Sequence, residues 1–112
     1  MQTNVTGPSG KVLDCPGYET LADVLSRAFD QAAAGKGQER HGNGKAFANQ
    51  PMQHIINLYG PGFALGQAAK KTQEAQRLPS VDRQVTELLG AIVYVAGAVI
   101  AIETAAKTGV KE

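Results

Sequence analysis

The apolar residues of this chain are concentrated in one uninterrupted stretch near its C-terminal end. Residues 88–102 read LLGAIVYVAGAVIAI, without a charged or amide side chain and with one hydroxyl group, that of Tyr94. A helix that is apolar on all sides has to be covered on all sides. Fifteen residues form a rod of about 22 Å, which is shorter than the ~30 Å hydrocarbon core of a bilayer. The stretch therefore predicts a central helix in a protein core, and no membrane partner.

The helix that contains this stretch is expected to run from Val81 to about Lys107, with Ser80 as its N-cap. It has a bulky edge, expected to face the core, and a small edge, expected to let a partner helix approach closely. Because a chain of 112 residues offers few other helices to cover both edges, we expect a homo-oligomer formed through residues 88–102. The bulky edge comprises Leu88, Leu89, Ile92, Val95, Val99 and Ile102, and the small edge Gly90, Ala91, Gly97, Ala98, Ala101 and Ala105.

Helical spacing also predicts a helix that starts near residue 20. Thr20 is its expected N-cap, because Asp23 follows at the position of a variant capping box, and Gly35 is its expected stop. One face is apolar at helical spacing and is expected to pack in the core. That face comprises Leu21, Val24, Leu25, Ala28, Phe29 and Ala32.

Two further helices are expected in the middle of the chain. Pro51 is typical of a first helical residue, with Asn49 or Gln50 as the cap. The sequence Gly-Pro-Gly at 60–62 predicts a break, after which a third helix should run from about Phe63 to Leu78. The expected buried face of this third helix consists of Leu65, Ala68, Ala69, Thr72 and Ala75.

The predicted fold class is therefore all-α. Residues 1–17 are rich in Gly and Pro and are expected to form an extended arm, and residues 18–112 a single helical domain. No stretch alternates between apolar and polar residues as a half-buried strand would. We expect a small helical hairpin or bundle of three to four helices with a long apolar C-terminal helix.

Charge and cysteine content narrow the function classes. The 11 basic and 10 acidic side chains nearly balance, which argues against a nucleic-acid partner bound by a wholly basic surface. Cys15 is the one cysteine, so an internal disulfide is excluded and a reducing compartment is favoured. The polar N-terminus carries no apolar signal region. These features together predict a cytoplasmic protein.

Residues 35–45, GKGQERHGNGK, are the best candidate for a binding site. Glycines allow backbone N–H groups to turn toward an anion, and Lys or Arg neutralise its charge. The spacing is not that of a Walker motif, and a solvated linker is the competing interpretation. The candidate ligand-binding residues are Lys36, Gly37, Arg40, His41, Asn43 and Lys45, with Lys70 and Lys71 completing a cationic pocket for a small anionic ligand.

Metal binding and catalysis have little support in the sequence. His41 and His54 are the two histidines, and neither has a cysteine or carboxylate partner at ligand spacing. No Ser, His and acid set can be derived from spacing either. We therefore expect no metal, no cofactor and no catalytic residue.

The run ELLGAIVYVAGAVIAIE, residues 87–103, resembles the closing helix of small phage-encoded helical proteins, including all-α nucleoside triphosphate pyrophosphatases of the MazG type. The resemblance implies Mg²⁺ held by E-x-x-E on one helix and E-x-x-D on another. Glu87 matches this pattern, whereas Gly90 stands at the next acidic position and Arg77 follows Glu74. What the resemblance implies is a nucleotide-handling helical scaffold without the hydrolytic metal.

Three functional hypotheses follow. The first is non-catalytic binding, with possible sequestration, of a nucleotide or nucleotide-derived signal, as a phage anti-defence protein would do. The second is a divergent nucleotide pyrophosphatase with Glu74, Glu87 and Glu103 as metal ligands. The third is a protein–protein inhibitor or assembly module that uses residues 35–45 as its contact surface.

Overall fold

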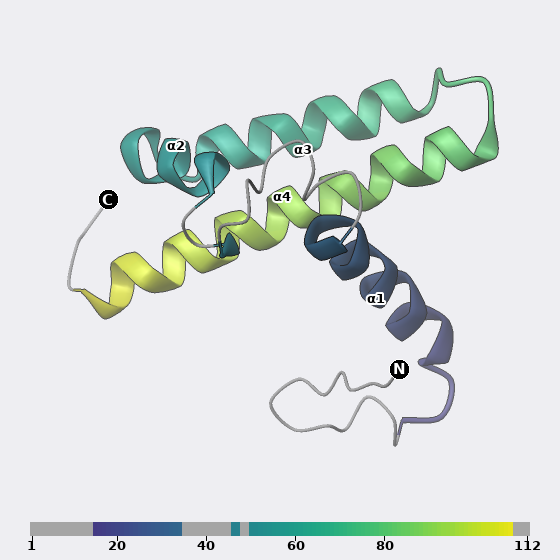
Figure 1. Ribbon diagram of the computed structural model, residues 1–112, viewed down its shortest axis with the longest axis horizontal. Helices are drawn as coiled ribbons and strands as arrows, with labels where there is room; N and C mark the ends of the chain where they lie inside the picture. Colours follow the sequence, from purple (N-terminus) through teal and green to yellow (C-terminus); the bar gives the residue numbers. More distant parts are fainter. Residues whose placement is uncertain (1–14, 35–45, 48–49, 109–112) are drawn as a thin grey trace.

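The computed structural model describes residues 15–34, 46–47 and 50–108. Regular structure in these residues is helical throughout, which confirms the all-α class. The helices are α1 (Glu19–Ala34), α2 (Pro51–Tyr59), α3 (Gly62–Ala75) and α4 (Val81–Lys107). Figure 1 shows α3 and α4 side by side as an antiparallel hairpin, with α2 next to the C-terminal half of α4. Helix α1 contacts α4 through its own C-terminal end, and the N-terminal end of α1 lies away from the hairpin.

The helix ends around α2 and α4 follow from their local sequence. The Ser80 hydroxyl accepts a hydrogen bond from the Arg83 amide at 3.2 Å, so the predicted N-cap of α4 is confirmed, as are its bounds. Gln50 is the N-cap of α2 and Pro51 its first residue. Gly60 ends α2 with a φ of 90°, a backbone conformation that glycine adopts without steric cost.

Two predicted helix ends are wrong. The first helix begins at Glu19, so Thr20 lies inside it and is not the cap. The Glu19 carboxylate instead accepts a hydrogen bond from the Gly17 amide at 3.0 Å, and an acidic group in a first turn also suits the helix dipole. The third helix ends at Ala75, before Leu78, because the chain tightens there into a turn in which the Leu78 amide bonds the Ala75 carbonyl.

The core lies where α2, α3 and α4 meet. Ile56, Ala64 and Ala98 are almost fully buried at its centre, and four partly buried side chains pack around them: Met52, Phe63, Tyr94 and Ala101. Two of the three central residues are alanines, so the helix backbones lie close together. The small edge of α4 therefore does make the predicted close contact, but its neighbours are α2 and α3 of the same chain.

The predicted face of α3 is wrong in part. Ala68 and Ala75 are buried as expected, together with Ala64. Leu65 is 48% exposed, and Ala69 and Thr72 also face outward. The reason is that α3 packs on the small edge of α4 through the side that carries its buried alanines, and the larger Leu65 lies off that side.

The bulky edge of α4 and the apolar face of α1 are also not where the sequence pattern placed them. Leu88, Val95 and Val99 are 42%, 44% and 48% exposed, and the one buried residue of the bulky edge is Leu89. On α1, Ala28 is buried, whereas Leu25 and Phe29 are 48% and 69% exposed. A helix packed through its small edge turns the opposite edge outward, and no other described helix covers it. By length and composition α4 could cross a membrane, and 22% of its most apolar window is buried.

We expect alanine to have opposite effects at the two glycines of α4. In a helix interior Ala is favoured over Gly by about 1 kcal/mol. A methyl group on Gly90 would meet the flexible end of Lys71, with Cδ at 3.3 Å, whereas on Gly97 it would lie 3.0 Å from Gln53 Nε2 and 3.2 Å from Met52 Cε. Gly90→Ala should raise the free energy of unfolding by up to about 1 kcal/mol. Gly97→Ala should lower it, because overpacking costs about 1–3 kcal/mol. Urea denaturation of both variants measures this, and equal effects would contradict the packing described.

Gln53 provides a second test of the core. Its side chain is 3% exposed, and Nε2 has no hydrogen-bond partner among the described residues. A buried unsatisfied donor costs about 1–3 kcal/mol. Gln53→Met keeps the length of the side chain but removes its amide group. The substitution should therefore raise the free energy of unfolding by about 1 kcal/mol or more. The exposed Gln73→Met is the matched control and should have little effect. A stability loss specific to Gln53→Met would show that the amide is satisfied in solution.

Candidate functional site

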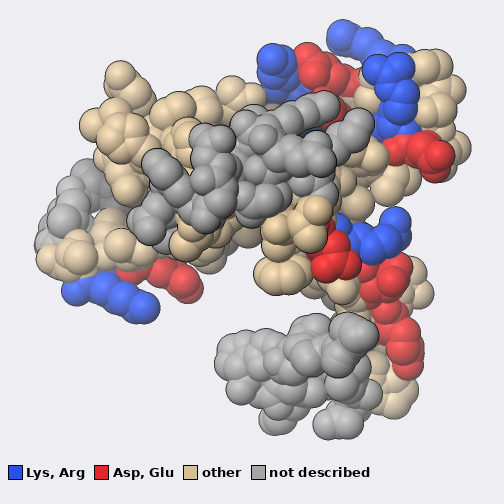
Figure 2. Space-filling model, in the orientation of Figure 1, with Lys and Arg blue, Asp and Glu red and all other residues tan. Residues whose placement is uncertain are grey.

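A cavity of about 1120 Å³ lies between α1, α3 and α4. Gly90, Val93 and Tyr94 of α4 line it, Gln31 of α1 lies on one side and Lys71 of α3 on the other. Figure 2 shows charged side chains of both signs along α1 and over the turn between α3 and α4, whereas the described surface over α2 is uncharged. Charged residues of both signs line the cavity.

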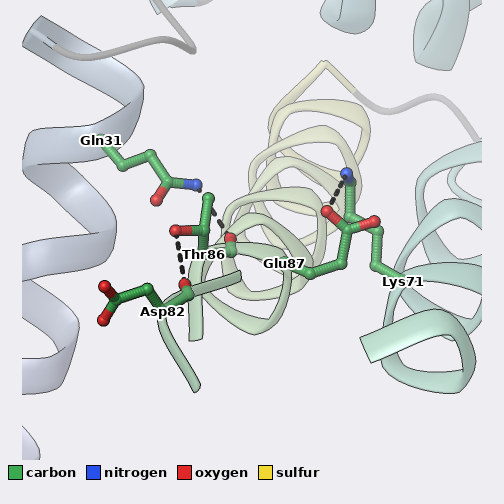
Figure 3. A network of polar contacts seen from close by, with 5 residues as sticks. All are labelled: Gln31, Lys71, Asp82, Thr86 and Glu87. Carbon is green, nitrogen blue, oxygen red and sulfur yellow. Dashed lines mark hydrogen bonds and ion pairs between the residues drawn. The ribbon is translucent and has the colours of Figure 1, made fainter. Parts of the chain in front are cut away.

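Lys71 is the central cation of the cavity. Its Nζ lies 3.5 Å from a carboxylate oxygen of Glu87 and 5.8 Å from the ring centroid of Tyr94. The side chains of Lys71 and Glu87 are each 27% exposed, so the pair is partly shielded from water. Figure 3 shows the two groups pointing toward each other from neighbouring helices. The Lys71 side chain passes α4 beside Gly90, with Cδ 3.3 Å from where an added methyl group would lie.

Tyr94 is held in place by packing. Its ring meets that of Phe63 edge to face, with centroids 6.4 Å apart and planes at 75°. Burial raises the pKa of the Tyr94 phenol above its ordinary value of 10.0, so the group is neutral at physiological pH. A neutral ring with Lys71 nearby offers a ligand both an apolar surface and a cation.

Polar contacts join α1 to the side of α4. The Gln31 amide donates a hydrogen bond to the Thr86 carbonyl at 3.2 Å, and the Thr86 hydroxyl donates to the Asp82 carbonyl at 2.9 Å. Figure 3 shows Gln31 reaching across from α1 toward Thr86. The Gln31 hydrogen bond joins α1 to α4 at this side of the cavity, whereas the bond between Thr86 and Asp82 lies within α4.

The cavity carries both signs of charge. Its cations are Arg27, Lys71 and Arg83, and its acids are Asp30, Glu74, Asp82 and Glu87. Arg27 pairs with Asp23 at 3.0 Å and Lys71 with Glu87, whereas Arg83 has no ion pair among the described residues. The lining therefore carries a formal excess of one negative charge, with acids and cations next to one another.

The structure separates the predicted site residues into two groups. Lys71 lines the cavity, whereas its neighbour Lys70 is exposed and is not part of the lining. The other six candidates lie outside the described residues: Lys36, Gly37, Arg40, His41, Asn43 and Lys45. Ala34, directly before this segment, and Phe47, two residues after it, both line the cavity.

No motif or spacing in the sequence places Arg83, Gln31 or Tyr94 in a site. A signal for the Lys71–Glu87 pair was nevertheless present. Pro79 marks the turn of a short hairpin, and these two residues lie eight positions before and after it. In an antiparallel hairpin, residues at equal distances from the turn lie at the same level, so the pair could have been predicted. The position of α1, and with it Gln31, has no comparable signal.

A metal site made by the three proposed carboxylates is excluded by their positions. Glu74 and Glu87 line the cavity, but Glu103 does not. Glu87 and Glu103 belong to one helix, and sixteen residues apart they are separated by about 24 Å. Among the described residues, no three His, Cys, Asp or Glu side chains lie close enough to share a metal ion. The pyrophosphatase hypothesis in its three-ligand form is therefore wrong.

Comparison of the chain with protein-family models, with curated proteins and with solved structures gave no match. The functional interpretation therefore depends on the site itself.

The raised pKa of Tyr94 predicts a pH effect on stability. Because the folded protein holds the phenolic proton more tightly than the unfolded chain does, the free energy of unfolding should fall as pH rises past the ordinary value of 10.0. Tyr94→Phe should remove this part of the decline. Tyr59→Phe, at a ring that is 77% exposed, is the control and should leave the decline unchanged. Urea unfolding on both sides of that pH measures it, and identical profiles for the two variants would contradict the assignment.

Proposed function

We propose that the cavity between α1, α3 and α4 binds a small phosphorylated ligand, a nucleotide or nucleotide-derived molecule, and holds it without converting it. The observation that carries this proposal is the position of Lys71. Its ammonium group faces the cavity, is partly shielded from water, and has one carboxylate contact, at 3.5 Å. A phosphate oxygen can share this ammonium group with Glu87 or replace Glu87 beside it, since an ammonium group has three donors.

The size and charge of the cavity support a nucleotide-like ligand. Its volume of about 1120 Å³ is sufficient for a small molecule, since such sites commonly enclose about 300–1,000 Å³. Arg83 supplies a second cation for the phosphate group. Asp30 and Glu74 can accept hydrogen bonds from the amino group of a base, and the Tyr94 ring offers an apolar surface. A simple inorganic anion would leave these acids unused.

The residues around the cavity favour binding over hydrolysis. Cleavage of a phosphoanhydride needs positioned metal ions or an activated nucleophile. Gly90 stands where the pyrophosphatases that residues 87–103 resemble carry a carboxylate, and Lys71 neutralises Glu87. Tight binding without turnover would sequester the ligand, which is the activity expected of a phage protein that removes a defence signal.

Hydrolysis is the second candidate, and one observation favours it. Glu74 and Glu87 reach the same cavity from neighbouring helices. Mg²⁺ is commonly held by one or two carboxylates together with substrate phosphates and water. Release of pyrophosphate from nucleoside triphosphates in the presence of Mg²⁺, lost in Glu87→Gln, would favour this candidate over simple binding.

Titration calorimetry with a panel of nucleoside mono-, di- and triphosphates tests the proposal. Lys71→Gln should weaken binding about tenfold or more, because a charged hydrogen bond contributes about 1.5–3 kcal/mol. Lys70→Gln removes the same charge from the adjacent, exposed position and should leave binding unchanged. The double variant Lys36→Ala, Arg40→Ala tests whether residues 35–45 contribute. Absence of binding at millimolar concentrations, or equal binding by the two lysine variants, would overturn the proposal.

A further inference from the structure

The open edge of α4 carries an uninterrupted heptad pattern. Large apolar residues recur at alternating steps of four and three along nearly the whole helix. Such spacing is that of the a and d positions of a coiled coil, sustained here over three heptads. Val85, Ile92 and Val99 occupy the a positions, and Val81, Leu88, Val95 and Ile102 the d positions. We call these seven side chains the α4 seam.

No residue of the α4 seam is buried. Val81 is 71% exposed and Ile102 48%, and the two least exposed members, Val85 and Ile92, are only partly covered. The opposite side of the helix carries Gly90 and Gly97, which lie against Lys71 and against α2. The chain itself thus uses one side of α4 and leaves the other, periodic side open over about 32 Å.

We propose that the α4 seam packs against the α4 seam of a second copy of this chain. A regular heptad pattern is complementary to itself, since each a and d side chain fits between four residues of a like helix. A pairing of identical surfaces around a twofold axis is the commonest way in which soluble proteins associate. Self-association at the bulky edge, rather than at the small one, is what the structure assigns to this helix.

The segments outside the described helices do not have the apolar pattern needed to pack on the α4 seam. Residues 35–45 contain no apolar side chain, and residues 109–112 contain Val110 alone. Residues 1–14 contain four large apolar side chains, at Met1, Val5, Val12 and Leu13. Only Val12 and Leu13 are neighbours, and polar residues, glycine and proline separate the others. None of these segments supplies a periodic apolar face that could match three heptads.

A bilayer is also a poor cover. The uncharged part of α4, residues 88–102, would span about 22 Å of a hydrocarbon core that is ~30 Å thick. The other side of α4 is packed on α3, which carries Lys70, Glu74 and two glutamines, and Lys71 pairs with Glu87 of α4. Insertion of α4 would either take these polar groups into the bilayer or separate the hairpin, and both are costly.

Association through the α4 seam leaves the proposed binding site accessible. The α4 residues that line the cavity, among them Glu87, Gly90, Val93 and Tyr94, do not occupy seam positions. The two surfaces therefore lie on different sides of the helix. The inference does not depend on the proposed function, and either can fail without the other.

Sedimentation equilibrium of the full chain tests the inference, with a charged substitution on the seam and a matched one beside it. Val95→Glu places a carboxylate at a central d position, 44% exposed, and Ile100→Glu places one at a position off the seam, 38% exposed. We expect the wild type and Ile100→Glu to have a mass at least twice 11.7 kDa. Val95→Glu should sediment at 11.7 kDa and retain the helical content of the wild type by circular dichroism.

Three outcomes would overturn the inference. The first is a wild-type protein that is monomeric at concentrations of tens of micromolar. The second is a Val95→Glu variant with the same mass as Ile100→Glu. The third is flotation of the wild type with phosphatidylcholine vesicles that Val95→Glu abolishes, since this would show that the seam binds lipid. If Val95→Glu does not fold, Val95→Ser and Ile100→Ser replace the two glutamate variants. Val95→Ser is then expected to dissociate the oligomer more than Ile100→Ser does.

Discussion

The close contact between the small edge of α4 and the helices α2 and α3 determines the rest of the structure. Ile56 and Ala64 meet Ala98 at its centre, and Gly97 leaves room for Gln53 and Met52. A glycine in a helix interior costs about 1 kcal/mol relative to alanine. At Gly97 the direct packing of α2 offsets this cost. At Gly90 only the flexible end of the Lys71 side chain lies nearby, so the cost there is largely not offset.

This packing also decides which sides of α4 remain available. With the small edge turned inward, the large side chains of the opposite edge face outward, where they form the α4 seam. Glu87 and Tyr94 lie on the inward side, next to Lys71, and the Thr86 carbonyl accepts a hydrogen bond from Gln31 of α1. One helix therefore serves as core element, as cavity wall and as the proposed surface for self-association. The core and the cavity share the inward side, where Tyr94 both packs on the core and lines the cavity, whereas the α4 seam uses the outward side.

The candidate site was predictable only in part. Lys71 was identified as a cation, and its partner Glu87 follows from the hairpin geometry around Pro79. The glycine-rich segment 35–45 remains a prediction; Ala34 directly before it and Phe47 two residues after it line the cavity. Arg83 and Gln31 could not be predicted, because their place depends on where α1 docks. That docking involves one buried residue of α1, Ala28, and the Gln31 contact with α4, neither of which has a distinctive sequence pattern.

The sequence by itself determined the elements: the helical class, the bounds of α4, the Ser80 cap, the Pro51 start and the Gly60 stop. These are local properties, set by side-chain hydrogen bonds to nearby amides and by backbone conformations that only certain residues adopt. The sequence did not determine which side of each amphipathic helix is covered. Burial is a property of pairs of surfaces, and the small edge of α4 and its bulky edge are both apolar. Only the tertiary structure could show that the chain packs on the small edge and leaves Leu88, Val95 and Val99 for another surface.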